Sequence, residues 1–194
     1  MNELEIIRSQ LTLEQSHAVE VANACAAVFA AASTASAPSE ATARFREACV
    51  GYLVWVLARF EERDQSLAEL LVSRQSQANG AAAASLRPLA ALIARAGTSR
   101  EALARLEAAL AAGDSASART GWQEFARFFN SAWAARRAAL AGALAEHLGV
   151  ADWRAVCAID ADSMLDERKR FERVLAQRPA GVELRRTPPA GTGS

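Results

Sequence analysis

The chain has few of the residues on which most metal and redox sites depend. Its 194 residues include two histidines, three cysteines and no CxxC pair. Two imidazoles cannot supply a centre that needs several, and the cysteine spacing indicates neither a zinc site nor a disulfide framework. We interpret Cys25, Cys49 and Cys157 as small core residues in a reducing cytosol. A redox pair of Cys25 with Cys49 is the alternative that the spacing leaves open.

Net charge and long apolar runs are absent as well. Lys and Arg number 22, and so do Asp and Glu, so no overall field favours nucleic acid or an acidic membrane. The most apolar run, residues 24–32, is too short to span a bilayer. Glu3 and Glu5 give the start of the chain the wrong polarity for a secretory signal. We expect a cytoplasmic protein that binds neither nucleic acid nor membrane, which leaves a protein partner or a homodimer.

What the chain does have is alanine, which dominates a hydrophobic content of 52%. Glycine and proline are scarce until the last stretch, so the composition favours helix over sheet. The length allows one well-buried core, and we assign residues 1–178 to a single domain. After Pro179 the composition shifts to Gly, Pro, Thr and Arg, which predicts a flexible tail over 179–194.

Apolar residues at three- and four-residue steps predict long helices over about 3–32, 39–77 and 115–148. Between the second and third of these, Pro88, Gly97 and a capping box predict two short helices. Gly149 is expected in the left-handed position that ends a helix, and a last helix is predicted over about 151–177. The fold class is therefore all-α, and the simplest packing is an up-down four-helix bundle with an additional C-terminal helix laid across it.

Two groups of residues resemble metal ligands. One is the acidic cluster of Glu61, Glu62 and Asp64 on the second helix, which we interpret as a helix flank balanced by Arg59 and Arg63; the other lies on the first helix. Glu14 and His17 form a Glu-x-x-His pair on the inner stripe of the first helix, the spacing by which a bundle helix offers two ligands to one metal. A di-iron carboxylate site needs a second such pair, and the sequence has none. We expect a structural role for the pair. The alternative is a weak iron site built from Glu14, His17, Glu61 and Glu62.

Arg136 is a charged residue on a stripe where an apolar residue belongs. A buried guanidinium requires an anionic partner. Asp160, which leans inward on the last predicted helix, has the opposite sign. We predict a partly buried ion-pair network of Arg136 with Asp160, Glu61 or Glu14. The charged run 166–170 is interpreted as a solvated helical face.

Two similar helical phrases carry a resemblance to a known family. They cover residues 57–62 (LARFEE) and 132–137 (AWAARR). Over roughly residues 10–150 the chain resembles the hemerythrin-like family, or cation-binding HHE domains, in which a histidine opens the first helix and the second and fourth helices carry a His-Phe-x-x-Glu-Glu-like phrase. His17 falls at the first-helix position. Leu57 and Ala132 take the places of the motif histidines, Glu61 and Glu62 keep one acidic doublet, and Arg136 with Arg137 replaces the other.

An intact member of this family implies a di-iron site for oxygen or redox sensing, and here most ligands of such a site are replaced. No pair of nucleophile and base supports an enzyme. We therefore expect a non-enzymatic regulatory or protein-interaction module with a degenerate metal site and no cofactor. The alternative is a hemerythrin-like metal or small-ligand sensor that uses the residual Glu and His residues with iron.

Overall fold

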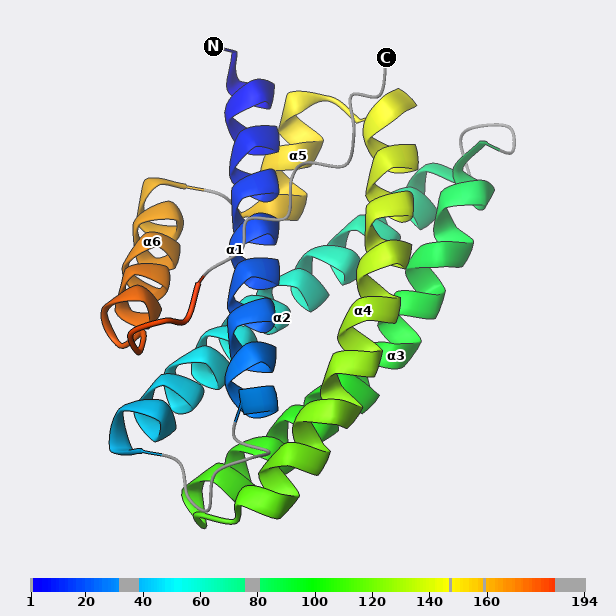
Figure 1. Cartoon of the computed structure of the whole chain (residues 1–194). Coiled ribbons are helices and arrows are strands. Elements are labelled where there is room, and N and C mark those ends of the chain that lie inside the picture. Colours follow the sequence, from blue (N-terminus) through cyan, green and yellow to red (C-terminus); the bar gives the residue numbers. More distant parts are fainter. Residues whose placement is uncertain (1, 32–38, 76–80, 147, 159, 184–194) are drawn as a thin grey trace, which may run out of the picture.

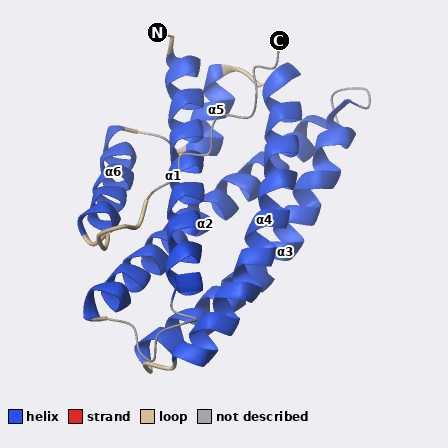
Figure 2. Cartoon of the chain, in the orientation of Figure 1, coloured by secondary structure: helices blue, strands red, loops and turns tan. Residues whose placement is uncertain are grey.

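The described part of the chain is helical apart from short connections. The computed structural model describes residues 2–31, 39–75, 81–146, 148–158 and 160–183, and no strand occurs in them (Figure 2). The prediction of an all-α protein is confirmed. The helices are α1 (Glu3–Ala31), α2 (Glu40–Gln75), α3 (Ala81–Ala111), α4 (Ser115–Glu146), α5 (Val150–Cys157) and α6 (Ala161–Ala176).

Each long helix packs against the next one along the chain. Contacts join α1 to α2, α2 to α3 and α3 to α4, and α1 also touches α4. In Figure 1 the longest shared face is that of α3 and α4, which lie side by side. The two short helices contact α1 and α2 only, within the described residues. As a result α6 stands at the edge of the molecule, beside α1 (Figure 1).

Apolar side chains form two separate buried clusters. The larger one joins α1 to α4 and includes Phe45, Leu53 and Phe125, all without exposed surface. The smaller one surrounds Leu67 and Trp153, each 1% exposed, where α5 closes one end of the bundle. On α1 and α2 the clusters meet near residues 14 and 63, and buried charged side chains lie there between them.

The structure corrects the predicted break in the third segment, because α3 is one continuous helix that contains Pro88 and Gly97. A glycine inside a helix costs only about 1 kcal/mol relative to alanine. Packing of an apolar face against neighbouring helices outweighs local propensity of that size. The face in question buries Leu89, Leu92, Ala102, Leu103 and Leu106.

The predicted last helix is two helices. Ala158 adopts a left-handed conformation with φ of 45° and ends α5. The backbone N–H of Ser163 donates a hydrogen bond of 2.7 Å to the side chain of Asp160, which therefore caps the start of α6. Gly149 is extended, with φ of −77°, and precedes α5 as its N-cap, so the left-handed conformation predicted for it is wrong. Gly113, in the turn between α3 and α4, has the left-handed φ of 69°.

The segment after α6 is described only in part. Residues 179–183 form a turn in which Gly181 has φ of 84°, and Val182 packs against the larger apolar cluster. The rest of the predicted tail, 184–194, lies outside the described residues. None of the described helices combines the length and the hydropathy that crossing a membrane requires.

Candidate functional site

Glu14 lies at the centre of a buried charged group and has no exposed surface. Arg63 donates to both of its carboxylate oxygens, and Arg59 donates to Oε1 over 3.5 Å. The amide of Gln10 is 3.3 Å from the same Oε1. Arg63 also donates from Nε to the backbone oxygen of Cys157 over 3.0 Å, which ties α5 to α2. The carboxylate that we considered as a metal ligand is thus occupied by two guanidinium groups.

Arg136 forms the second buried ion pair, with a partner that we did not predict. Its Nε and Nη2 lie 3.1 and 2.5 Å from Oδ2 of Asp64, and the two side chains are 9% and 7% exposed. Burial raises the pKa of Asp64, and the adjacent guanidinium opposes that rise. The guanidinium also lies over the ring of Phe60, 4.8 Å from its centroid. Hydrogen bonds and a cation–π contact therefore hold Arg136 inside the bundle.

The structure corrects the other members of the predicted network. Asp160 is exposed and caps α6, so it is not the partner of Arg136. Glu61 pairs with the exposed Arg100 over 3.2 Å. Burial raises the pKa of Glu61, while Arg100 and then Arg136 act in the opposite direction. Glu61 is thus close enough to feel the charge of Arg136 without being its partner.

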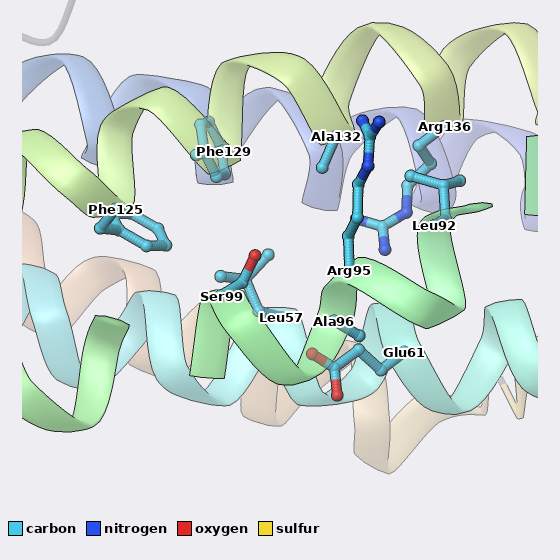
Figure 3. Close-up of a pocket in the computed structure, with 10 residues that line it drawn as sticks. All are labelled: Leu57, Glu61, Leu92, Arg95, Ala96, Ser99, Phe125, Phe129, Ala132 and Arg136. Carbon is cyan, nitrogen blue, oxygen red and sulfur yellow. The ribbon is translucent and has the colours of Figure 1, made fainter. Parts of the chain in front are cut away.

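The two similar phrases meet in space. Leu57 and Glu61 on α2 line the same pocket as Ala132 and Arg136 on α4 (Figure 3). The pocket has a volume of about 30 Å³, enough for roughly one water molecule. Leu57 and Ala132, which the resemblance in the sequence matches to motif histidines, therefore line one small pocket. The side chain of Arg137 lies outside the described part.

The four residues of the alternative metal site are not brought together. Glu14 binds arginines, Glu61 pairs with Arg100, Glu62 is exposed, and His17 turns to a different carboxylate. Among the described residues no group of three or more His, Cys, Asp or Glu side chains is arranged to hold a metal ion. The described structure therefore does not assemble the alternative iron site from these four residues.

The carboxylate that His17 contacts belongs to Glu167 on α6, which is 1% exposed. Its Oε1 accepts from Tyr52 Oη over 2.7 Å and lies 2.8 Å from His17 Nδ1. Its Oε2 is buried and has no hydrogen-bond partner within the described residues. The solvated face predicted for 166–170 is therefore wrong at this residue. Glu167 is buried because it lies on the same face of α6 as Phe171 and Val174, at helical spacing from both. That face packs against α1 and α2.

The contacts of His17 set its protonation pattern. A carboxylate accepts hydrogen bonds, so Nδ1 carries the proton that points at Glu167. The imidazole stacks on Phe171 with 3.6 Å between ring centroids and 7° between planes. Nε2 makes no hydrogen bond to any described residue, and the side chain is 15% exposed. The ring is therefore held in one orientation, and Nε2 is the ring nitrogen left without a described partner.

His17 and Glu167 line an open groove between α1 and α6 with a volume of about 580 Å³. Three leucines on its walls are unusually exposed: Leu13 at 45%, Leu165 at 48% and Leu175 at 36%. Among the described residues six large apolar side chains are at least 36% exposed, and three of the six line this groove. Exposed apolar side chains gathered around a groove mark a binding surface more often than scattered ones do. We take this groove, called the α1/α6 groove, as the candidate functional site.

Sequence reasoning missed this groove. Glu167 was hidden in a run of five charged residues, and Tyr52 lay on α2 without a recognisable neighbour. The available signal was amphipathic spacing, since Leu175 and Leu165 widen the apolar stripe that Phe171 and Val174 form. An apolar arc wider than one packing contact needs indicates a second apolar contact.

No protein-family model, curated protein or solved structure matches this chain. The resemblance to the hemerythrin-like family therefore stays a prediction, based on the residues at positions 17, 57–62 and 132–137.

Buried acidic protons predict a loss of stability at alkaline pH. Burial raises the pKa of Cys157 to about 11 from an ordinary value of 9.0, and it also raises those of Cys25 and Tyr52. Between pH 9.0 and about pH 11, the Cys157 thiol has lost its proton in the unfolded chain but keeps it in the folded chain. Stability from Cys157 is then complete below pH 9 and is lost as the pH rises towards 11, a change on the order of 2–3 kcal/mol.

Urea unfolding at a series of pH values from 8 to about 10.5 measures this effect. We expect Cys157→Ala to be less stable at pH 8 but to lose less stability on going to alkaline pH. Parallel curves for the variant and the natural chain contradict the assignment to Cys157.

Proposed function

We propose that this protein is a non-enzymatic regulatory bundle that binds a small apolar or amphiphilic ligand in the α1/α6 groove. The observation that carries the proposal is the group of exposed leucines around the buried pair of His17 and Glu167. The groove volume of about 580 Å³ lies inside the range of about 300–1,000 Å³ typical of small-molecule sites. Mostly apolar walls with a few converging polar groups are also typical of such sites.

The thiols support a binding role over a catalytic one. All three cysteines are buried and unpaired by disulfides. Burial raises the pKa values of Cys25 and Cys157, which keeps them as unreactive thiols at neutral pH. Three reduced, buried cysteines are also what a cytoplasmic location favours, and cytoplasmic location is part of the proposal.

We further propose that the four long helices form an up-down bundle of the hemerythrin-like kind, in which ion pairs replace a metal centre. The contacts of each long helix with the next support the topology. The meeting of Leu57 with Ala132 around one pocket supports the replacement. In this proposal the buried ion pairs stabilise the fold, and the ligand binds outside the bundle interior, in the α1/α6 groove.

A neutral fluorescent dye tests the ligand proposal. We expect N-phenyl-1-naphthylamine to bind the folded chain saturably at one site. The double variant Leu165→Asp with Leu175→Asp places charges on the groove wall and weakens binding by about tenfold or more. The matched control is Val72→Asp, because Val72 is 58% exposed on α2 and does not line the groove. This control keeps the affinity of the natural chain.

The proposal is overturned if Val72→Asp weakens dye binding as much as the groove variant does, or if the groove variant binds the dye as tightly as the natural chain. No dye binding by a folded protein also overturns it and leaves the interpretation as a protein-interaction module. Circular dichroism confirms that each variant is folded before the titration is interpreted.

A further inference from the structure

We propose that the α1/α6 groove is a site for iron porphyrin, with His17 as the axial ligand to the iron. This inference rests on the proposed function, because it names the ligand class for the same groove. It is carried by three observations: the hydrogen bond of His17 to a buried carboxylate, the absence among the described residues of any group of three or more His, Cys, Asp or Glu side chains that could hold a bare ion, and the mostly apolar groove walls.

His17 has the arrangement of a metal-ligating histidine. Such histidines almost always donate their second ring N–H to a carboxylate, a backbone oxygen or a water, which fixes the tautomer and raises the basicity of the ligating nitrogen. Here Nδ1 faces Glu167 at 2.8 Å, and Tyr52 donates to the same carboxylate oxygen at 2.7 Å. Stacking on Phe171 fixes the plane of the ring. The nitrogen left for a ligand is Nε2, which no described residue contacts by a hydrogen bond.

A single ready histidine selects the class of metal cofactor. A bare zinc or iron ion needs three or four protein ligands, and within the described residues no cluster of that kind exists. An iron porphyrin carries four nitrogen ligands of its own, so one imidazole from the protein is enough to hold it in the manner of the globins. The site is thus poor for a free ion and suitable for a metal that arrives in a macrocycle.

The walls of the groove match the rest of such a cofactor. Leu13, Leu165 and Leu175 offer apolar surface to a macrocycle, and Met164 lines the same groove. Arg168 stands at the rim, 75% exposed, and pairs with Glu172 over 2.8 Å. An exposed pair of this type contributes little stability. Its guanidinium is therefore free to exchange partners and bind a propionate carboxylate.

The competing explanation is that Tyr52, Glu167 and His17 only fasten α6 to the bundle. Fastening accounts for the burial of Glu167. It does not account for three leucines exposed around the same histidine, or for an imidazole nitrogen that has no hydrogen-bond partner among the described residues. A porphyrin in the groove covers the leucines and uses the nitrogen at the same time.

Titration of the full chain with hemin, followed by the Soret band, tests the inference. We expect a one-to-one complex with the spectrum of histidine-ligated haem. His17→Phe keeps a ring against Phe171 but removes the ligand nitrogen, so the histidine-ligated spectrum is lost. Free imidazole restores that spectrum in His17→Ala if the groove itself holds the porphyrin. The matched control is His147→Ala, which removes the other histidine of the chain and keeps the natural spectrum.

Glu167→Gln tests the positioning role of the carboxylate. We expect it to keep haem binding but to weaken it by about 10- to 100-fold, as loss of an outer-shell partner does in metal sites, and to shift the haem spectrum. A structural clasp alone would change stability without changing the spectrum.

Two results overturn the inference. One is the absence of a Soret shift with the natural chain, and the other is an unchanged spectrum and affinity in His17→Phe, which means adventitious hemin adsorption. Dye binding that depends on Leu165 and Leu175 without any hemin complex leaves the ligand-binding proposal in place and rejects the porphyrin. The two proposals therefore fail in distinguishable ways.

Discussion

Arg136→Glu lowers the free energy of unfolding by several kcal/mol, on the order of 3–5 kcal/mol or more. The change removes the cation that Asp64 needs and adds a second negative charge beside it, where both side chains are less than a tenth exposed. Removal of one partner of a buried pair is strongly destabilising because it leaves an uncompensated buried charge. Equilibrium unfolding in urea, with a check that the slope with denaturant is unchanged, measures the effect.

Two control variants distinguish the cost of leaving one buried charge unpaired from the net contribution of the ion pair to stability. Asp64→Leu combined with Arg136→Met removes both charges, and we expect it to be more stable than Arg136→Met alone, because apolar replacement of a whole buried pair is often neutral or stabilising. Arg100→Met breaks the pair with Glu61, in which the side chain of Arg100 is 65% exposed and that of Glu61 is 12% exposed, and we expect it to cost less than Arg136→Glu because solvent screens the arginine. A loss in Arg100→Met as large as that in Arg136→Glu contradicts the importance of burial.

Glu14→Gln is the second substitution with a large expected effect, again about 3–5 kcal/mol of lost stability. Glutamine has nearly the same shape as glutamate but carries no charge, so Arg63 and Arg59 stay in the interior without their anion. Their side chains are 9% and 20% exposed. The loss is expected in the presence of a metal chelator as well, because the role of Glu14 is to pair with arginine. Thermal or urea unfolding with and without EDTA provides the measurement.

Glu62→Gln is the matched control, since Glu62 belonged to the same alternative metal site but is exposed on α2. We expect its stability to stay within about 0.5 kcal/mol of the natural chain. If Glu14→Gln is equally mild, or if its effect appears only when metal is present, the ion-pair interpretation of the interior is wrong.

The helical content and most helix ends were predictable, because they depend on local spacing and capping. Asp114 accepts hydrogen bonds from the backbone of Ala116 and Ser117 at the start of α4, at the turn that Gly113 indicates. The break predicted at Gly97 is wrong because tertiary contacts outweigh that local signal, and neighbouring helices stabilise α3. The inward position predicted for Asp160 is wrong because a local signal was missed, since Asp160 caps the start of α6 through Ser163.

The charged interior could be predicted only in part. The position of Arg136 on an apolar stripe indicated a buried cation, because helical periodicity fixes the face on which a residue lies. The choice of Asp64 as its partner depends on how the bundle places α2 relative to α4, across 72 positions of sequence. Glu167 and His17 are 150 positions apart, and no local pattern connects them.

The sequence by itself determined an all-helical chain, short of imidazoles and thiols, with charges placed where apolar residues belong. Only the tertiary structure decided which charges meet, that Leu57 and Ala132 share one small pocket, and that α6 leaves an apolar groove open beside His17. The physical reason is that backbone propensity and periodicity act over a few residues. Ion pairs, cavities and grooves arise from the packing of whole helices, and a single sequence does not encode that packing in any local pattern.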